Sequence, residues 1–151
     1  MKYKFLIYLA VSFFVFVGLV FYNYFQAQKA IKDTRTSPLS ISLTSYPKQV
    51  RVGDEANFAW YIEASPDLNT SFTTIYWGYE SSPSALTKKD SPEAVKYPNF
   101  PVDYTSGNFK LPDNFDLNIS FHKPGRVWFR SYAKVKNDHL WSEEKYLDVT
   151  N

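Results

Sequence analysis

The side chains that could do chemistry are few, and their spacing matches no known catalytic arrangement. The chain has two histidines, His122 and His139, and no cysteine. Both histidines flank predicted turns, and no motif pairs either one with a serine nucleophile. Asp and Glu are scattered singly, and no glycine-rich phosphate or dinucleotide motif occurs. We therefore expect a protein that is not an enzyme and that carries no cofactor.

One short segment carries oxygen ligands at a spacing that suggests a cation site. Asp113, Asn114, Asp116 and Asn118 lie close together in the sequence, and carboxylate and amide oxygens are typical calcium ligands. However, Asp116 and Asn118 alternate with apolar residues, which is the pattern of the polar side of a strand. We expect a strand here and no metal site.

A second pattern places arginine and aromatic side chains on one face of a predicted strand at residues 126–135. Two neighbouring strands should add further rings to this face. The expected group is Arg126, Trp128, Arg130, Tyr132, Trp141 and Tyr76. Guanidinium groups over aromatic rings contribute about 0.5–2 kcal/mol each. Two interpretations stay open: a structural cation–π ladder resembling those of cytokine-receptor modules, and a recognition patch, because Tyr, Trp and Arg dominate interface hot spots.

Alternating apolar residues predict the strands that would position this face. The period of two begins near Leu39 and recurs through strands at residues 56–63, 70–80, 115–121, 126–135 and 145–149. In each predicted strand, the side that carries the apolar residues should face the core. The expected core residues are Phe58, Trp60, Ile62, Ile75, Phe115, Leu117, Ile119, Val127, Phe129 and Ala133.

Residues 81–114 form a connection with five prolines and no clear periodicity. Because unstructured loops of this length are uncommon in compact domains, the connection should contain local structure. Ser82-Pro83 and Ser91-Pro92 each place a capping residue before a proline, which predicts two short helical turns. We also expect an edge strand near residues 102–104.

The order of several residues resembles that of a fibronectin type III-like or immunoglobulin-like module. Trp60 stands where the family has its core tryptophan, Pro124-Gly125 resembles the turn before the sixth strand, and Trp141-Ser142-Glu143 resembles the entry to the seventh. The resemblance implies an all-β, two-sheet sandwich of about seven strands. It also implies display or recognition, without naming a partner.

The N-terminal region predicts a membrane anchor. Residues 5–25 carry no charge and are almost entirely apolar or aromatic, and a helix of this length spans a bilayer. We expect a tail at 1–4, a transmembrane helix at 5–25, a tether at 26–37 and the sandwich at 38–151. A cleaved signal peptide is the main alternative, and a pilin-type leader is a remote one, because Leu9 stands where such pilins commonly have a glutamate.

Charge and topology complete the expected picture. Residues 1–36 carry five Lys or Arg and one acidic residue, a net of +4, so the remainder of a chain of net charge +2 carries −2. A slightly acidic domain is a poor nucleic-acid binder. The expected partners are membrane lipid at the helix and a protein or envelope polymer at the sandwich. We expect a single-pass protein with a cytoplasmic N-terminus and the sandwich outside. The alternatives are a structural subunit of an envelope assembly, such as a filament or stator support, and an envelope hydrolase.

Overall fold

The structure is a computed structural model that describes residues 15–26, 38–82, 84–95 and 97–151. The chain divides into two units, Met1–Thr36 and Ser37–Asn151. Each unit is described by itself below.

In the first unit, residues 15–26 are helical, and all of their large apolar side chains except Val17 are exposed. Gln26 donates a hydrogen bond to the Tyr22 hydroxyl one turn earlier, at 2.9 Å. Residues 5–14 of the expected transmembrane helix lie outside the described residues, as do the 1–4 tail and residues 27–37 of the tether. Across the described part of the chain, no helix combines the length and the apolar character needed to cross a membrane.

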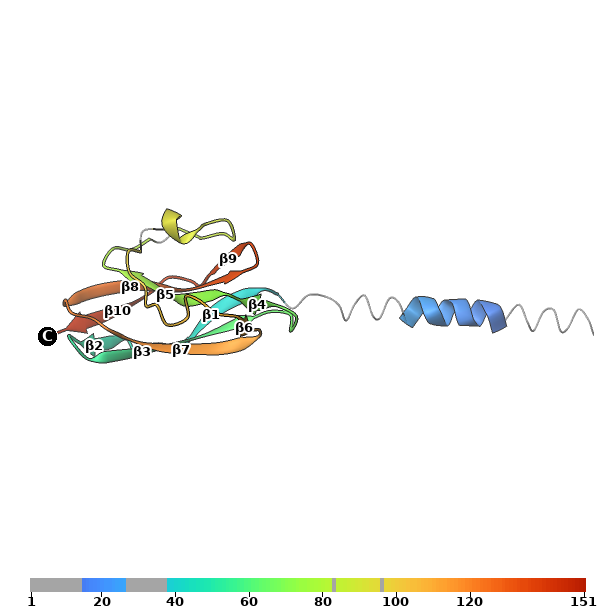
Figure 1. Cartoon of the computed structure of the whole chain (residues 1–151), viewed down its shortest axis with the longest axis horizontal. Coiled ribbons are helices and arrows are strands. Elements are labelled where there is room, and N and C mark those ends of the chain that lie inside the picture. The colour runs from blue at the N-terminus through green and yellow to red at the C-terminus, as the bar shows by residue number, and fades with distance from the viewer. Residues whose placement is uncertain (1–14, 27–37, 83, 96) are drawn as a thin grey trace, which may run out of the picture. The chain divides into compact units, whose positions relative to one another are not determined.

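The second unit is an all-β sandwich, and its two layers are visible in Figure 1. One sheet has the order β1-β3-β7, and the other has the order β2-β10-β8-β5 with β9 also paired to β8. The strands are β1 (Ser40–Ser45), β2 (Gln49–Arg51), β3 (Glu55–Glu63), β4 (Asn69–Thr70), β5 (Phe72–Gly78), β6 (Phe109–Lys110), β7 (Asp113–Ser120), β8 (Gly125–Val135), β9 (Asp138–Trp141) and β10 (Lys145–Thr150).

The strand order is that of an immunoglobulin-like sandwich. The first strand divides between the sheets: β1 pairs with β3, whereas β2 crosses over and pairs in parallel with β10. The last strand is also divided, into β9 and β10. Between them, the Ser142 amide still donates to the Ser131 carbonyl at 3.0 Å, which keeps this stretch attached to β8. The expected two-sheet fold is therefore confirmed.

Alternation along the strands decides which side chains fill the core. In β3, residues 56, 58, 60 and 62 are buried, whereas Glu55 and Asn57 are exposed. Trp60 stacks on Phe115 with ring centroids 5.8 Å apart, and its indole nitrogen donates to the Thr73 hydroxyl at 2.8 Å. All ten expected core residues are buried.

The connection at residues 81–114 contains local structure, but not all of it is where the sequence predicts. The expected turn after Ser91 is present as the 3₁₀ helix η1 (Pro92–Ala94). Pro83, in the other expected turn, lies outside the described residues. The edge strand expected at 102–104 is wrong, because these residues form a bend and a turn. Instead, Asn99 bridges to Trp77 at the edge of β5.

Candidate binding surface on strands β8 and β10

The outer face of β8 has one buried and one exposed half. Arg130 and Tyr132 are 5% and 1% exposed, whereas Arg126 is exposed and Trp128 half-buried. Arg130 and Tyr132 are thus too deeply buried to belong to a recognition patch, which was one of the two interpretations. The physical reason is the connection that contains η1, which lies over the outside of the sheet formed by β5, β8 and β9 (Figure 1).

Under this covering segment, the described residues of 81–101, the aromatic side chains form a second apolar cluster. Tyr76, Tyr132 and Trp141 meet as expected, with centroids 5.4 Å apart for the two tyrosines and 4.5 Å apart for Tyr132 and Trp141. Val95 and Tyr97 of the covering segment pack against them. Burial, assisted by the nearby Glu93 carboxylate, raises the pKa of Tyr76 to about 12. Tyr76 and Tyr132 are buried and have a structural role, whereas Trp141 stays half-buried at the border of the cluster.

Arg130 fixes the covering segment to the sheet by hydrogen bonds. Its guanidinium donates to the carbonyls of Ser82, Ser84 and Ser142 at 2.9, 3.1 and 3.0 Å. A longer bond of 3.4 Å reaches the Tyr97 hydroxyl. The expected stacking of Arg130 on an aromatic ring does not occur among the described cation–π contacts, which involve Lys123 and Arg126. The guanidinium instead binds backbone carbonyls of the covering segment.

Glu144, the residue directly before β10, reinforces the same attachment. Its carboxylate accepts hydrogen bonds from the Tyr97 hydroxyl, the Ser81 hydroxyl and the Ser82 amide. Partial burial opposes ionisation of Glu144, but these hydrogen bonds outweigh it and lower its pKa below the ordinary value. Burial and the bond to Glu144 raise the pKa of Tyr97. Glu144 is therefore a charged acceptor for the covering segment.

The exposed half of the face is a compact aromatic and arginine surface. Register places Tyr146 directly opposite Trp128, and Asp148 directly opposite Arg126. The Trp128 and Tyr146 ring centroids are 5.2 Å apart, and the Arg126 guanidinium lies 4.2 Å from the Tyr146 centroid. Tyr146 is nevertheless 46% exposed. This surface, formed by Arg126, Trp128, Tyr146 and Asp148, is called the β8–β10 surface below.

Asp148 holds Arg126 in place over the tyrosine ring. The guanidinium donates to both carboxylate oxygens, at 2.9 and 3.3 Å. This hydrogen bonding raises the pKa of Arg126 and lowers the pKa of Asp148. An exposed pair of this kind adds little stability. Its effect is to orient the guanidinium, so that a ligand would meet a planar donor and two rings in fixed positions.

A groove of about 590 Å³ continues from the β8–β10 surface towards the crossing between β1 and β2. Its lining residues are Tyr46, Lys48, Gln49, Glu144, Lys145, Tyr146 and Asp148. Two lysines and a glutamine thus add hydrogen-bond donors beside the rings. In the described part of the chain, no group of three or more His, Asp or Glu side chains is placed to hold a metal ion. The groove suits recognition by stacking and hydrogen bonding.

Tyr146, Lys48 and Gln49 were not predicted from the sequence as members of this site. Tyr146 could have been noticed in the sequence, because it is an aromatic residue at a position where the alternation of the last predicted strand points outward. Its partner could be found only from the register between β8 and β10. Lys48 and Gln49 join the site only because β2 changes sheets, and no periodicity in the sequence marks that crossing.

No protein family and no curated protein matches the sequence of the chain. Solved structures share its general shape at low identity. The PKD domain of an M14-like peptidase from the Thermoplasmatales archaeon SCGC AB-540-F20 is 13% identical with a TM-score of 0.48, and the match covers 74% of this chain and 94% of that one. A CARDB domain from Pyrococcus furiosus, solved with di-metal ions, is 10% identical with a TM-score of 0.42, over 77% and 90% of the two chains.

A β-glucosidase from Listeria innocua, solved with glucose, is 10% identical with a TM-score of 0.46. That match covers 76% of this chain but only 16% of the β-glucosidase. The assignment of the fold therefore comes from the strand order of the chain itself.

Proposed function

We propose that this protein is a non-catalytic, membrane-anchored interaction module whose sandwich binds a protein or an envelope polymer through the β8–β10 surface. The observation that carries the proposal is the exposed cluster of Arg126, Trp128 and Tyr146 beside the groove. Rings and guanidinium groups that are held in place lose little conformational entropy on binding, which is why they dominate interface hot spots.

The anchor would be residues 5–25. These residues are uncharged, and the described part of them exposes Phe16, Leu19 and Phe21. Apolar side chains on all sides of a helix are unfavourable in water and favourable in lipid. The proposed topology has a cytoplasmic N-terminus and the sandwich outside. Intact-mass analysis of the membrane fraction tests the anchor: a soluble protein that begins near residue 28 or 31 would show cleavage instead.

The binding role is tested by affinity capture of the full chain from its native membrane. A variant with Trp128→Ala and Tyr146→Ala should lose captured partners, because both rings of the surface are removed. The matched control is Tyr61→Ala, which removes a half-buried ring from the outer side of β3. If both variants capture the same partners as the unaltered chain, the β8–β10 surface is not the binding site.

A further inference from the structure

Strand β7 forms one edge of the β1-β3-β7 sheet. It pairs with β3 over eight consecutive residues, Asp113–Ser120, without a bulge. Among the described strands, none pairs with its other edge. A four-stranded sheet of the immunoglobulin type has a further strand at this position. The β1-β3-β7 sheet therefore stops one strand short of that arrangement.

The free edge presents backbone groups at every second residue. The Tyr104 hydroxyl donates to the Asp116 carbonyl at 3.1 Å, which shows that this carbonyl points away from β3. In an antiparallel pair, both backbone groups of a residue point to the same side, and the side alternates along the strand. The amides and carbonyls of Asn118 and Ser120 therefore also point to the free edge, where they can pair with another strand.

The other sheet edges are shorter, irregular or covered. β1 has a register shift between Leu43 and Ser45, and β2 is only three residues long. At β5, the Thr73 amide donates to the Tyr104 carbonyl and the Trp77 amide to the Asn99 carbonyl, at 3.0 and 2.9 Å. Proteins usually protect edges by lysine, proline or bulges. β7 has no lysine, proline or bulge. The Tyr104 side chain covers its Asp116 carbonyl, and the Asn118 and Ser120 groups lie beyond that contact.

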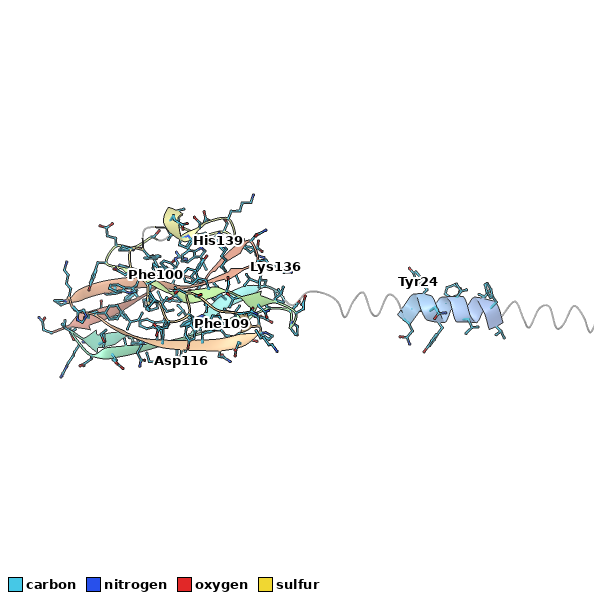
Figure 2. The ribbon with its side chains drawn as sticks, in the orientation of Figure 1. Tyr24, Phe100, Phe109, Asp116, Lys136 and His139 are labelled. Carbon is cyan, nitrogen blue, oxygen red and sulfur yellow. The ribbon has the colours of Figure 1, made fainter. Side chains whose placement is uncertain are left out.

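A groove of about 440 Å³ lies against this edge. Residues 118–120 of β7 line one side, and Trp77 together with residues 98–101 lines the other. Phe100 is 43% exposed and Val102 is 74% exposed. Figure 2 shows Phe100 beside the upper layer and Asp116 on the lower one. An added strand would find hydrogen-bonding groups on one wall and apolar contacts nearby.

The charge of this region indicates what kind of segment fits. The three strands of the β1-β3-β7 sheet contain four acidic residues and no lysine or arginine. Asp116 is exposed on the outer side of β7, and Asp103 in the adjoining turn is also exposed. A strand with lysine or arginine on its outward side would meet these carboxylates, whereas an acidic strand would be repelled.

We propose that the free edge of β7 binds an extended, basic segment of a partner protein by strand addition. The partner's backbone pairs with residues 118–120, beyond the Asp116 carbonyl that Tyr104 already binds, and its lysines or arginines face the acidic outer side of the sheet. Main-chain hydrogen bonds supply the affinity in this mode of recognition, and alternate side chains supply the specificity. This site is separate from the β8–β10 surface, which belongs to the other sheet.

The test uses the full chain in neutral detergent micelles and a labelled heptapeptide of alternating lysine and valine with blocked ends. Binding is followed by fluorescence anisotropy. Asn118→Pro removes one amide from the free edge without removing a bond to β3, because proline is tolerated where the amide faces outward. Its dissociation constant should rise about tenfold. The matched control, Asn118→Ala, keeps the backbone amide and should bind as tightly as the unaltered chain.

Two further arms keep the test decisive if Asn118→Pro does not fold. Asp116→Lys should weaken binding of the basic peptide, and a peptide N-methylated on alternate residues should not bind. Hydrogen exchange at the Asn118 and Ser120 amides should slow when the peptide binds. The proposal is overturned if the N-methylated peptide or a glutamate–valine peptide binds equally well, or if the basic peptide does not bind. A dimer of the chain that forms without peptide and is broken by Asn118→Pro would assign the edge to a second copy instead.

Discussion

Removal of the Arg130 side chain should detach the covering segment from the sheet. Arg130→Ala takes the donor away from three carbonyls bound at 2.9 to 3.1 Å. Hydrogen bonds to charged groups contribute roughly 1.5–3 kcal/mol each, and their effects are not additive within a network. Because the carbonyls of Ser82 and Ser84 can regain water when the segment opens, we expect a loss of about 3 kcal/mol in the free energy of unfolding.

Arg126→Ala is the matched control, because Arg126 lies on the same strand and face but is exposed. Its ion pair with Asp148 is solvated, so its removal should leave the free energy of unfolding almost unchanged. Both variants are measured by urea denaturation followed by tryptophan fluorescence. Limited proteolysis provides a second measurement: in Arg130→Ala, cleavage should begin within residues 81–101, while the β strands stay intact.

Two outcomes would refute this reasoning. If Arg130→Ala were as stable as Arg126→Ala, the guanidinium bonds would contribute no more than an exposed pair. If Arg130→Ala were strongly destabilised but cleaved at random along the chain, Arg130 would support the whole sandwich and not the covering segment in particular.

Three further predictions concern the core and the acid response. Ser131→Ala should raise the free energy of unfolding by about 1 kcal/mol, because the Ser131 hydroxyl is buried without a hydrogen-bond partner among the described residues; an unchanged or lower value in denaturation would contradict this. Trp60→Ala should lower it by about 3–5 kcal/mol through lost burial and a cavity, and an unchanged melting curve would exclude Trp60 from the core. Folding lowers the pKa of Glu144 below its ordinary value of 4.5, so the hydrogen bonds of the ionised carboxylate stabilise the fold fully above pH 4.5. This stabilisation is lost as the pH falls through the lower pKa of the folded state. The stability of Glu144→Gln should therefore fall less steeply on acidification than that of the unaltered chain.

The core could be predicted from the sequence because a strand has only two faces. Once Phe58 is placed inside, the period of two places Trp60 and Ile62 inside as well. The same rule assigned Val127 and Phe129 to the interior of β8. No long-range information was needed, since each strand carried its own pattern.

The candidate site could be predicted only in part because alternation does not say what covers the outer face of a sheet. Arg126 and Arg130 have the same periodicity on β8, yet one is exposed and the other is buried under residues 81–101. That segment has no periodicity, and its position depends on contacts such as Arg130 with the Ser82 carbonyl. The sequence also does not reveal the register between β8 and β10, and without that register Tyr146 could not be placed beside Trp128.

Glu144 connects the two halves of the outer face. It lines the groove that adjoins the β8–β10 surface, and it also accepts hydrogen bonds from Ser81, Ser82 and Tyr97 of the covering segment. The groove wall and the covering segment therefore depend on the same carboxylate. Any change that releases the segment from Glu144 also alters the groove, because the carboxylate must then find other donors. A change in the covering segment can thus reach the groove through Glu144, although the groove adjoins the exposed half of the face.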